Sequence, residues 1–145
     1  MITFGAIMSK NFDFENLFIF DLANNHQGDV EHALNIIRGV GEIVSETKVR
    51  GGLKFQFRQL ETFIHPDFKE KDDIKHIPRF MSTALSPSEY RKLIREVRKQ
   101  GMFTICTPFD EESVDLIMKT DIDVIKIASC SALDWPLLEK VPKPG

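Results

Sequence analysis

The sequence lacks the features that mark secreted, membrane-spanning and nucleic-acid-binding proteins. It has two cysteines, Cys106 and Cys130, without the spacing of a metal site, so we expect reduced thiols and no disulfide framework. It has no apolar run of membrane length, and residues 1–5 lack a basic start and a signal-type core, so we expect a cytoplasmic protein without a membrane partner. The formal net charge of −3 disfavours nucleic acid as a partner.

The length and composition of the chain are typical of one globular domain. The chain has 145 residues, of which 42% are hydrophobic and 28% are charged, and this is enough for a single buried core. Residues 1–16 form a mixed lead-in, for which either a small hairpin or edge strand or a surface arm would fit. We therefore expect the folded domain to occupy residues 17–145.

Residues 51–58 give the clearest secondary-structure signal. Apolar and polar side chains alternate there with the period of a β-strand: Leu53, Phe55 and Phe57 against Lys54, Gln56 and Arg58. Two other predicted strands, at 17–23 and 124–128, carry Asp21 and Lys126 among apolar neighbours. If these strands are parallel neighbours, their polar residues could converge on one site. The alternative is an ordinary strand face in water.

Strands and helices alternate along the rest of the chain. A further strand is predicted at 102–107, and helices are predicted after Asp29, after the capping box at 86–89, after Asp110 and after Asp134. Such alternation indicates a parallel sheet, either open and doubly wound or part of a barrel. No glycine-rich phosphate fingerprint follows the first strand, which counts against a dinucleotide fold. The long segment 59–85 is expected to be a lid or to carry short helices.

Four short motifs, each at a predicted strand end, together resemble the sialic acid synthase family. The family's Ala-Glu-Ile-Gly-x-Asn-His-x-Gly corresponds to Phe-Asp-Leu-Ala-Asn-Asn-His-Gln-Gly at 20–28, and its Val-Lys-x-Gln to Leu-Lys-Phe-Gln at 53–56. Its Ser-Thr-Pro-Phe-Asp, followed by x-x-Ser-Val-Asp, corresponds to residues 106–115, and its Lys-Ile-x-Ser to residues 126–129. Each motif alone is weak, but four in order over most of residues 17–143 are a specific signal.

The resemblance implies the N-terminal half of a TIM-type (β/α)8 barrel, with about four parallel strands and their helices. A complete barrel takes about 250 residues, so residues 17–145 would be a partial barrel domain that ends before the fifth strand. We therefore expect the sequence to be part of a longer chain. In the family, a C-terminal antifreeze-like domain reaches over the partner's site, so the full-length protein is expected to be a homodimer.

The resemblance also implies an activity. Members of this family condense phosphoenolpyruvate with an N-acetylated hexosamine to form a nine-carbon keto-acid sugar, with release of phosphate. By resemblance, Lys54, Thr107, Lys126 and Ser129 bind phosphoenolpyruvate, and Gln56 lies close by. A phosphate and a carboxylate need fixed cations and short hydroxyl donors. Two lysines that face one barrel mouth would repel each other unless an anion lay between them, and the alternative is two lysines that reach solvent separately.

Further residues are candidates for the acceptor side of the site. Asp21 stands where the family has a glutamate that resembles a substrate-orienting or proton-handling acid, and the alternative is a capping or salt-bridging carboxylate. Asn25 and His26 lie on the first loop, where His26 would bind substrate or hold the loop in place. Arg58 departs from the family pattern and would contact an acidic group on the acceptor or be solvated.

The resemblance adds one cofactor, a divalent metal. In the family a metal such as Mn²⁺ or Mg²⁺ polarises the aldehyde of the acceptor sugar. Its histidine ligands belong to later strands, so none of the four histidines here is assigned as a metal ligand. Cys130 and Ser131 stand where many relatives have Gly-Asp or Gly-Glu, so an acid that could contact the acceptor is absent.

Two other functions stay open at this point. A Schiff-base aldolase would use Lys126 as its nucleophile inside an apolar barrel, although the paired Lys54 and the Thr-Pro-Phe motif favour the synthase. A half-barrel that ended at Gly145 would have open sheet edges and would be a non-catalytic assembly partner.

Overall fold

Strands and helices alternate in the structure as the sequence predicts. The computed structural model describes residues 12–71 and 73–141. In chain order these residues form β1 (Leu17–Asp21), α1 (Val30–Thr47), β2 (Arg50–Phe57), α2 (Leu60–Phe63), η1 (Pro66–Phe68), α3 (Ile77–Ser82), α4 (Pro87–Lys99), β3 (Phe103–Pro108), α5 (Glu111–Met118), β4 (Val124–Ile125), η2 (Ser129–Ser131) and α6 (Trp135–Lys140).

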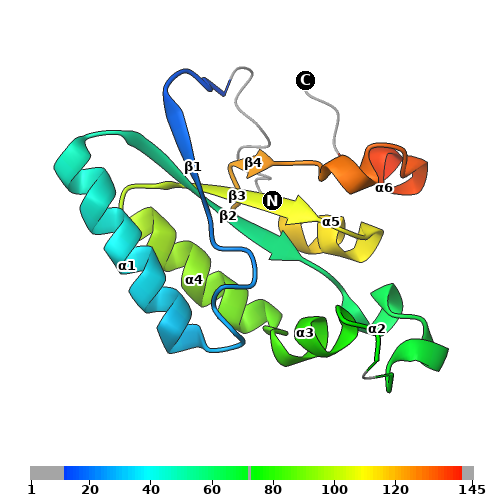
Figure 1. Cartoon of the computed structure of the whole chain (residues 1–145). Helices are drawn as coiled ribbons and strands as arrows, with labels where there is room; N and C mark the ends of the chain where they lie inside the picture. Colours follow the sequence, from blue (N-terminus) through cyan, green and yellow to red (C-terminus); the bar gives the residue numbers. More distant parts are fainter. Residues whose placement is uncertain (1–11, 72, 142–145) are drawn as a thin grey trace, which may run out of the picture.

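The four strands form one parallel sheet in the order β1-β2-β3-β4 (Figure 1). Each strand lies beside the next one in the chain, and a helix-containing crossover joins each pair. A doubly wound sheet would reverse its strand order at a switch point. The described strands show no such reversal, so their order is that of a barrel segment.

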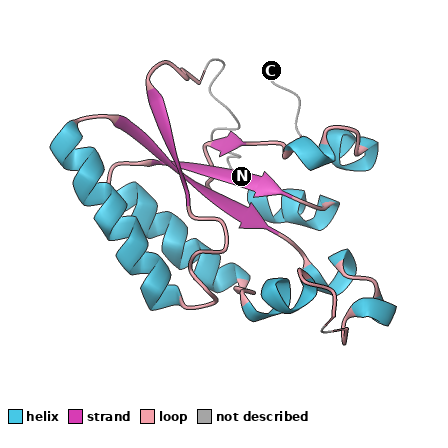
Figure 2. Ribbon diagram, in the orientation of Figure 1, coloured by secondary structure: helices cyan, strands magenta, loops and turns pink. Residues whose placement is uncertain are grey.

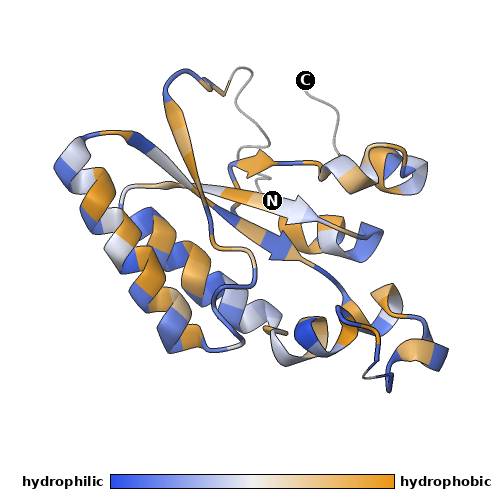
Figure 3. Ribbon diagram, viewed as in Figure 1, coloured by the Kyte–Doolittle hydropathy of each residue, from blue (hydrophilic) through white to orange (hydrophobic). Residues whose placement is uncertain are grey.

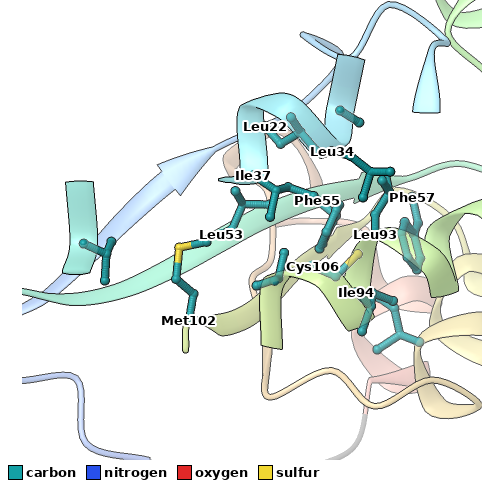
Figure 4. Packing of buried hydrophobic residues seen from close by; sticks show 14 residues of the cluster. Leu22, Leu34, Ile37, Leu53, Phe55, Phe57, Leu93, Ile94, Met102 and Cys106 are labelled. Carbon is teal, nitrogen blue, oxygen red and sulfur yellow. The ribbon is translucent and has the colours of Figure 1, made fainter. Parts of the chain in front are cut away.

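Helices α1 and α4 lie side by side and pack against the sheet (Figure 2). Each helix combines apolar and polar residues (Figure 3). Between these helices and the sheet, Leu53, Phe55 and Phe57 are at most 1% exposed and pack with Leu34 and Leu93 (Figure 4). The apolar side of β2 is therefore the core side. Within the described ranges, no helix combines the length and the apolar character that crossing a bilayer requires.

Side chains cap the helices where the sequence predicts them. Asp29 accepts hydrogen bonds from two backbone N–H groups in the first turn of α1. Ser86 and Glu89 form the reciprocal capping box of α4, and Asp110 and Asp134 cap α5 and α6. These caps fix where each helix begins, and so they fix the lengths of the loops at the carboxyl ends of the strands.

The long segment 59–85 after β2 carries short helices, which was one of the two predicted alternatives, the other being a lid. Helices α2 and α3 lie beyond the carboxyl end of β2 (Figure 1). Helix α3 closely approaches the loop that follows β1: a Cβ added to Gly28 would lie 2.4 Å from the Ser82 carbonyl oxygen. The loop after β1 and the segment after β2 therefore meet at one end of the sheet.

Two predictions at the edges of the domain need correction or restriction. The last strand was expected at 124–128 but covers only Val124–Ile125, because β4 has a strand neighbour on one side only and the chain turns into η2 at Ser129. Residues 1–11 of the lead-in lie outside the described residues, and residues 12–16 contain a turn and no strand. For residues 1–11, the hairpin or edge strand stays a prediction.

Candidate active site at the carboxyl ends of the strands

Polar side chains from four neighbouring strands share the sheet face that the buried phenylalanines of β2 do not occupy. The strand register places Asp21 beside Lys54, and Gln56 beside Thr107. Extending the register of β3 and β4 by one residue places Lys126 beside Thr107, and the Lys126 backbone N–H donates a hydrogen bond to β3 at 2.9 Å. We call this set the inner strand face: Asp21, Lys54, Gln56, Thr107 and Lys126.

Lys54 and Asp21 form an ion pair on this face. The Lys54 Nζ lies 2.8 Å from the Asp21 carboxylate, and the two side chains are 13% and 49% exposed. The predicted alternative of a salt-bridging Asp21 is therefore present in the structure. Because the carboxylate is half exposed, the pair is screened, and it orients the lysine more than it stabilises the fold.

Lys126 directly follows β4 and Ser129 comes three residues later, and both side chains are exposed. The Lys126 Nζ donates a hydrogen bond to the Ile127 carbonyl at 3.3 Å, and it has no acidic partner among the described residues. Ser129 begins the short helix η2. The structure thus places an ammonium group and a hydroxyl group at the same end of the sheet, both accessible to a ligand.

Thr107 lies between the two lysine positions and is 2% exposed. Its Oγ1 is buried and has no hydrogen-bond partner in the described part of the chain. A buried hydroxyl without a partner costs about 1–3 kcal/mol, and such groups occur where an ion, a water molecule or a ligand completes the site. On the inner strand face, this hydroxyl is a donor without an acceptor.

Arg58 is the first residue after β2, two residues beyond Gln56. Two aromatic rings lie against its guanidinium group. The guanidinium carbon is 3.9 Å from the centroid of the Phe109 ring and 4.5 Å from that of Phe80. Its Nη2 donates a hydrogen bond to the Gln56 Oε1 at 3.0 Å, and its buried Nε has no partner in the described residues. Burial lowers the pKa of Arg58. Of the two predicted alternatives for Arg58, full solvation fits this arrangement less well, because the two rings cover part of the half-buried group.

A cavity of about 220 Å³ opens beside this arginine. Its wall joins the end of β2 to the segment 59–85 and to α4. The lining residues include Asn24, Gln56, Arg58, Phe80, Thr83 and Tyr90. A second, more polar cavity of about 430 Å³ shares Asn24 and Thr83 with it. Sequence reasoning missed Phe80, Thr83 and Tyr90. The one signal was the length of the segment 59–85.

The loop after β1 is held by its own backbone and by His26. Asn25 is exposed, and its Nδ2 donates a hydrogen bond to the Asp21 carbonyl at 3.4 Å. His26 is 1% exposed, and its Nδ1 accepts a hydrogen bond from the Gly28 backbone N–H at 3.1 Å. These contacts favour the loop-holding role of His26 over direct substrate binding. Ala23, where the family pattern has glycine, has a φ of 42° and so occupies the left-handed region.

The role of His26 can be tested through the pH dependence of stability. Burial, with a smaller contribution from His32, lowers the pKa of His26 below the usual 6.5. The unfolded chain therefore binds the proton more readily, and the folded state loses stability as the pH falls through 6.5, with the full loss below the folded-state pKa. In urea unfolding between pH 8 and pH 5, we expect the stability advantage of wild type over His26→Asn to shrink on acidification. A constant difference would contradict this role.

Metal-binding side chains do not gather in this part of the molecule. Among the described residues, no group of three or more histidine, cysteine, aspartate or glutamate side chains could hold a metal ion. Cys106 is buried and Cys130 is exposed, and neither forms a disulfide. The inner strand face with the neighbouring Ser129 carries ammonium and hydroxyl groups, and such groups suit an anionic ligand.

Comparison with known proteins identifies relatives of this arrangement. The NeuB family matches residues 48–145. The chain is 28% identical to human N-acetylneuraminate-9-phosphate synthase over 134 residues, 88% of this chain and 36% of the human protein. It is 26% identical to N,N'-diacetyllegionaminic acid synthase of Campylobacter jejuni, over 89% of this chain and 40% of that protein. An uncharacterised protein of Methanocaldococcus jannaschii, MJ1065, is 36% identical over 124 residues, 83% of this chain and 33% of MJ1065.

Two solved structures with a similar fold point to the same group of proteins as the sequence relatives. A Chromobacterium violaceum structure described as spore coat polysaccharide biosynthesis protein E superposes with a TM-score of 0.84 at 52% identity, over 87% of this chain and 38% of that one. The sialic acid synthetase of Leptospira borgpetersenii, solved with citrate, superposes with a TM-score of 0.68 at 23% identity, over 86% of this chain and 40% of that one, which shows a shared fold.

These matches define what part of a protein the chain represents. The chain spans between 33% and 40% of the length of the curated relatives named here. Its four parallel strands and their helices match the N-terminal part of the barrel in the solved structures. The predicted fold class and the predicted family resemblance are both confirmed, and the chain belongs to the NeuB family.

Proposed function

We propose that the complete protein condenses phosphoenolpyruvate with an N-acetylated hexosamine or a related sugar to form a nonulosonate, with release of phosphate. Two kinds of observation support this proposal. The chain belongs to the NeuB family, and two of its relatives carry the names of an N-acetylneuraminate-9-phosphate synthase and an N,N'-diacetyllegionaminic acid synthase. The observation that carries the proposal is the inner strand face, where two lysines and a hydroxyl donor without a partner lie on neighbouring strands.

The proposed reaction forms one carbon–carbon bond and breaks one bond to phosphate. Carbon 3 of phosphoenolpyruvate attacks the aldehyde carbon of the open-chain sugar, and the aldehyde oxygen takes a proton and becomes a hydroxyl. Water adds at carbon 2, and phosphate leaves. Phosphoenolpyruvate, sugar and water are thus converted to the keto-acid sugar and inorganic phosphate, without an oxidant or a reductant.

Each residue of the inner strand face has a role in this proposal. Lys54 and Lys126 hold the anionic groups of phosphoenolpyruvate, because ammonium groups make strong charge-assisted hydrogen bonds to carboxylate and phosphate oxygens. Thr107 and Ser129 add hydroxyl donors to the same oxygens. Asp21, which lies 2.8 Å from Lys54, would orient that lysine, and it would also move a proton at the substrate.

The remaining expectations belong to the complete protein and are part of this proposal. A divalent metal would polarise the aldehyde, and its ligands would lie outside the described residues, which contain no group of three or more side chains that could hold a metal ion. The complete protein would act in the cytoplasm as a homodimer. The partial barrel domain at 17–145 would then supply the phosphoenolpyruvate side of the active site.

The Schiff-base alternative has less support. A nucleophilic lysine is activated by desolvation in an apolar pocket, whereas Lys126 is exposed. Borohydride trapping of a carbonyl substrate on Lys126 would support this alternative. The non-catalytic alternative predicts that the complete protein folds but consumes no phosphoenolpyruvate.

The first experiment measures phosphate release by the full-length protein. Phosphoenolpyruvate is supplied with Mn²⁺ or Mg²⁺ and with a panel of N-acetylated hexosamines, and the product mass is determined. We expect release that depends on one sugar and a product that contains all the carbon atoms of both substrates. Folded protein that releases no phosphate with any sugar would contradict the proposal, and borohydride trapping would then separate the aldolase from the non-catalytic alternative.

A further inference from the structure

Lys126 follows a strand that pairs with its neighbour over a short stretch. Strand β4 pairs with β3 at two positions, Ile105 with Val124 and Cys106 with Ile125. The Lys126 backbone N–H adds a hydrogen bond to the Cys106 carbonyl at 2.9 Å. A shift of one residue in this register would turn Lys126 from the inner strand face to the face that the helices cover. Any further contact that fixes where β4 begins therefore also fixes where Lys126 points.

Asp123, the residue before β4, makes such a contact with its side chain. Its Oδ2 accepts hydrogen bonds from the Thr104 backbone N–H at 2.7 Å and from the Thr104 hydroxyl at 2.8 Å. Its own backbone N–H donates to the Thr104 carbonyl at 3.0 Å. Thr104 is 0% exposed, so loss of the carboxylate would leave buried donors without a partner. The carboxylate thus extends the contact between β3 and the β4 segment by one residue.

Arg98 of α4 holds the other oxygen of the same carboxylate. Its Nη2 donates to the Asp123 Oδ1 at 3.1 Å and to the Asp121 carbonyl at 2.7 Å. The Asp121 carboxylate lies 3.2 Å from this nitrogen, but it is 84% exposed. Asp121 and Asp123 therefore share one arginine, whereas the bonds to the buried Thr104 backbone N–H and hydroxyl come from the carboxylate of Asp123.

We propose that Asp123 is a positioning residue for the phosphoenolpyruvate site and that it acts through Lys126. The inference rests on the proposed function, in which Lys126 holds phosphoenolpyruvate. Lys126 comes three residues after Asp123, so strand alternation places the two side chains on opposite faces. The contact with Arg98 keeps Asp123 on the helix-covered face, and Lys126 then points to the inner strand face. Asp123 touches no substrate, and its removal changes only where the lysine lies.

The test is a double-mutant cycle in the full-length protein, measured as phosphate release at varied phosphoenolpyruvate concentrations. We expect Asp123→Ala to lower kcat/KM for phosphoenolpyruvate by roughly tenfold, because a misplaced lysine keeps part of its contact. In that background Lys126→Ala should cost roughly tenfold instead of roughly 100-fold, so the double variant should equal Lys126→Ala alone. Lys54→Ala should keep its roughly 100-fold cost in both backgrounds, because β2 pairs along its length with β1 and β3.

The matched control is Asp121→Ala, which removes an acid from the same loop and the same arginine but leaves the Asp121 carbonyl in place. Its kcat/KM should equal that of wild type. Thr104→Val should lower kcat/KM in the same way as Asp123→Ala, and Thr104→Ser, which keeps the hydroxyl, should restore it. If Asp123→Ala does not fold, the cycle is run with Thr104→Val. Equal costs of Lys126→Ala in both backgrounds would overturn the inference.

Hydrogen exchange separates this inference from the proposed function, because it needs no substrate. The exchange of the β4 peptide that contains Lys126 is followed by mass spectrometry. In Asp123→Ala this peptide should exchange roughly tenfold faster than in wild type, while the peptides of β2 keep their protection. If wild type releases no phosphate with any sugar, the proposed function fails. Faster exchange would then still support the placement of Lys126 by Asp123, and unchanged exchange would overturn it.

Discussion

Replacing Lys54 with alanine in the full-length protein is expected to lower kcat/KM for phosphoenolpyruvate by roughly 100-fold, because a hydrogen bond to a charged group contributes about 1.5–3 kcal/mol and each 1.36 kcal/mol is a factor of ten. The substitution removes the less exposed of the two lysines of the inner strand face, whose side chain is 13% exposed. Lys126→Ala should give a loss of similar size, since that lysine has no acidic partner among the described residues. Phosphate release at varied phosphoenolpyruvate concentrations measures both effects.

The matched control removes an ammonium group elsewhere on the surface. Lys119→Ala at the end of α5 changes the net charge by the same amount, and Lys119 is exposed and lies outside the inner strand face. Its kinetics should equal those of wild type. Near-normal constants in both Lys54→Ala and Lys126→Ala would show that phosphoenolpyruvate binds elsewhere, and the site assignment would fail.

The Asp21–Lys54 pair needs a separate variant, since Lys54→Ala also leaves Asp21 without its partner. Asp21→Asn keeps the size of the side chain and removes its charge. If Asp21 only orients Lys54, the KM for phosphoenolpyruvate should rise while kcat and its pH profile stay unchanged. If Asp21 moves a proton, kcat should fall and the acidic limb of its pH profile should disappear. The two outcomes separate a positioning residue from a catalytic one.

The alternation in β2 predicted both faces of the sheet correctly. Leu53, Phe55 and Phe57 became the core because three apolar side chains at period two need a covering layer, and the amphipathic helices α1 and α4 provide it. Because side chains alternate between the two faces of a strand, Lys54 and Gln56 then had to lie on the opposite face. The ends of the helices were equally predictable, because capping is a local interaction between residues a few positions apart.

The position of Arg58 between the rings of Phe80 and Phe109 could not be predicted from the sequence, for a physical reason. Phe80 approaches Arg58 across an irregular segment of short helices, and no local periodicity fixes how such a segment folds back on the strand. The burial of His26 was similarly hidden, because its hydrogen bond to Gly28 depends on a tight loop geometry. The length of β4 was overestimated since Lys126 and Ile127 continue the apolar–polar alternation after the strand has ended.

Gly28 links the two loops that frame the candidate site, and Gly28→Ala is expected to be the most destabilising single-methyl change in them. Gly28 has a φ of 78°, and an added Cβ would lie 2.4 Å from the Ser82 carbonyl oxygen, a backbone atom that cannot rotate away. The left-handed conformation costs an alanine about 1–2 kcal/mol, and the overpacking adds about 1–3 kcal/mol. We expect a loss of about 2–5 kcal/mol in the free energy of unfolding, the sum of these two costs, measured by urea denaturation of the full-length protein.

Gly39→Ala is the opposite case and therefore the control. Gly39 lies inside α1, its added Cβ would meet nothing within 4 Å, and alanine in a helix interior is favoured over glycine by about 1 kcal/mol. The same chemical change should therefore stabilise the protein at position 39 and destabilise it at position 28.

Gly28→Ala should also raise the KM for the acceptor sugar. Both cavities are lined by Asn24, from the loop after β1, and by Thr83, from the end of α3. The added methyl group would push these two segments apart. A Gly28→Ala protein with unchanged stability and unchanged acceptor KM would show that the contact between the loop after β1 and α3 does not shape the acceptor side of the site.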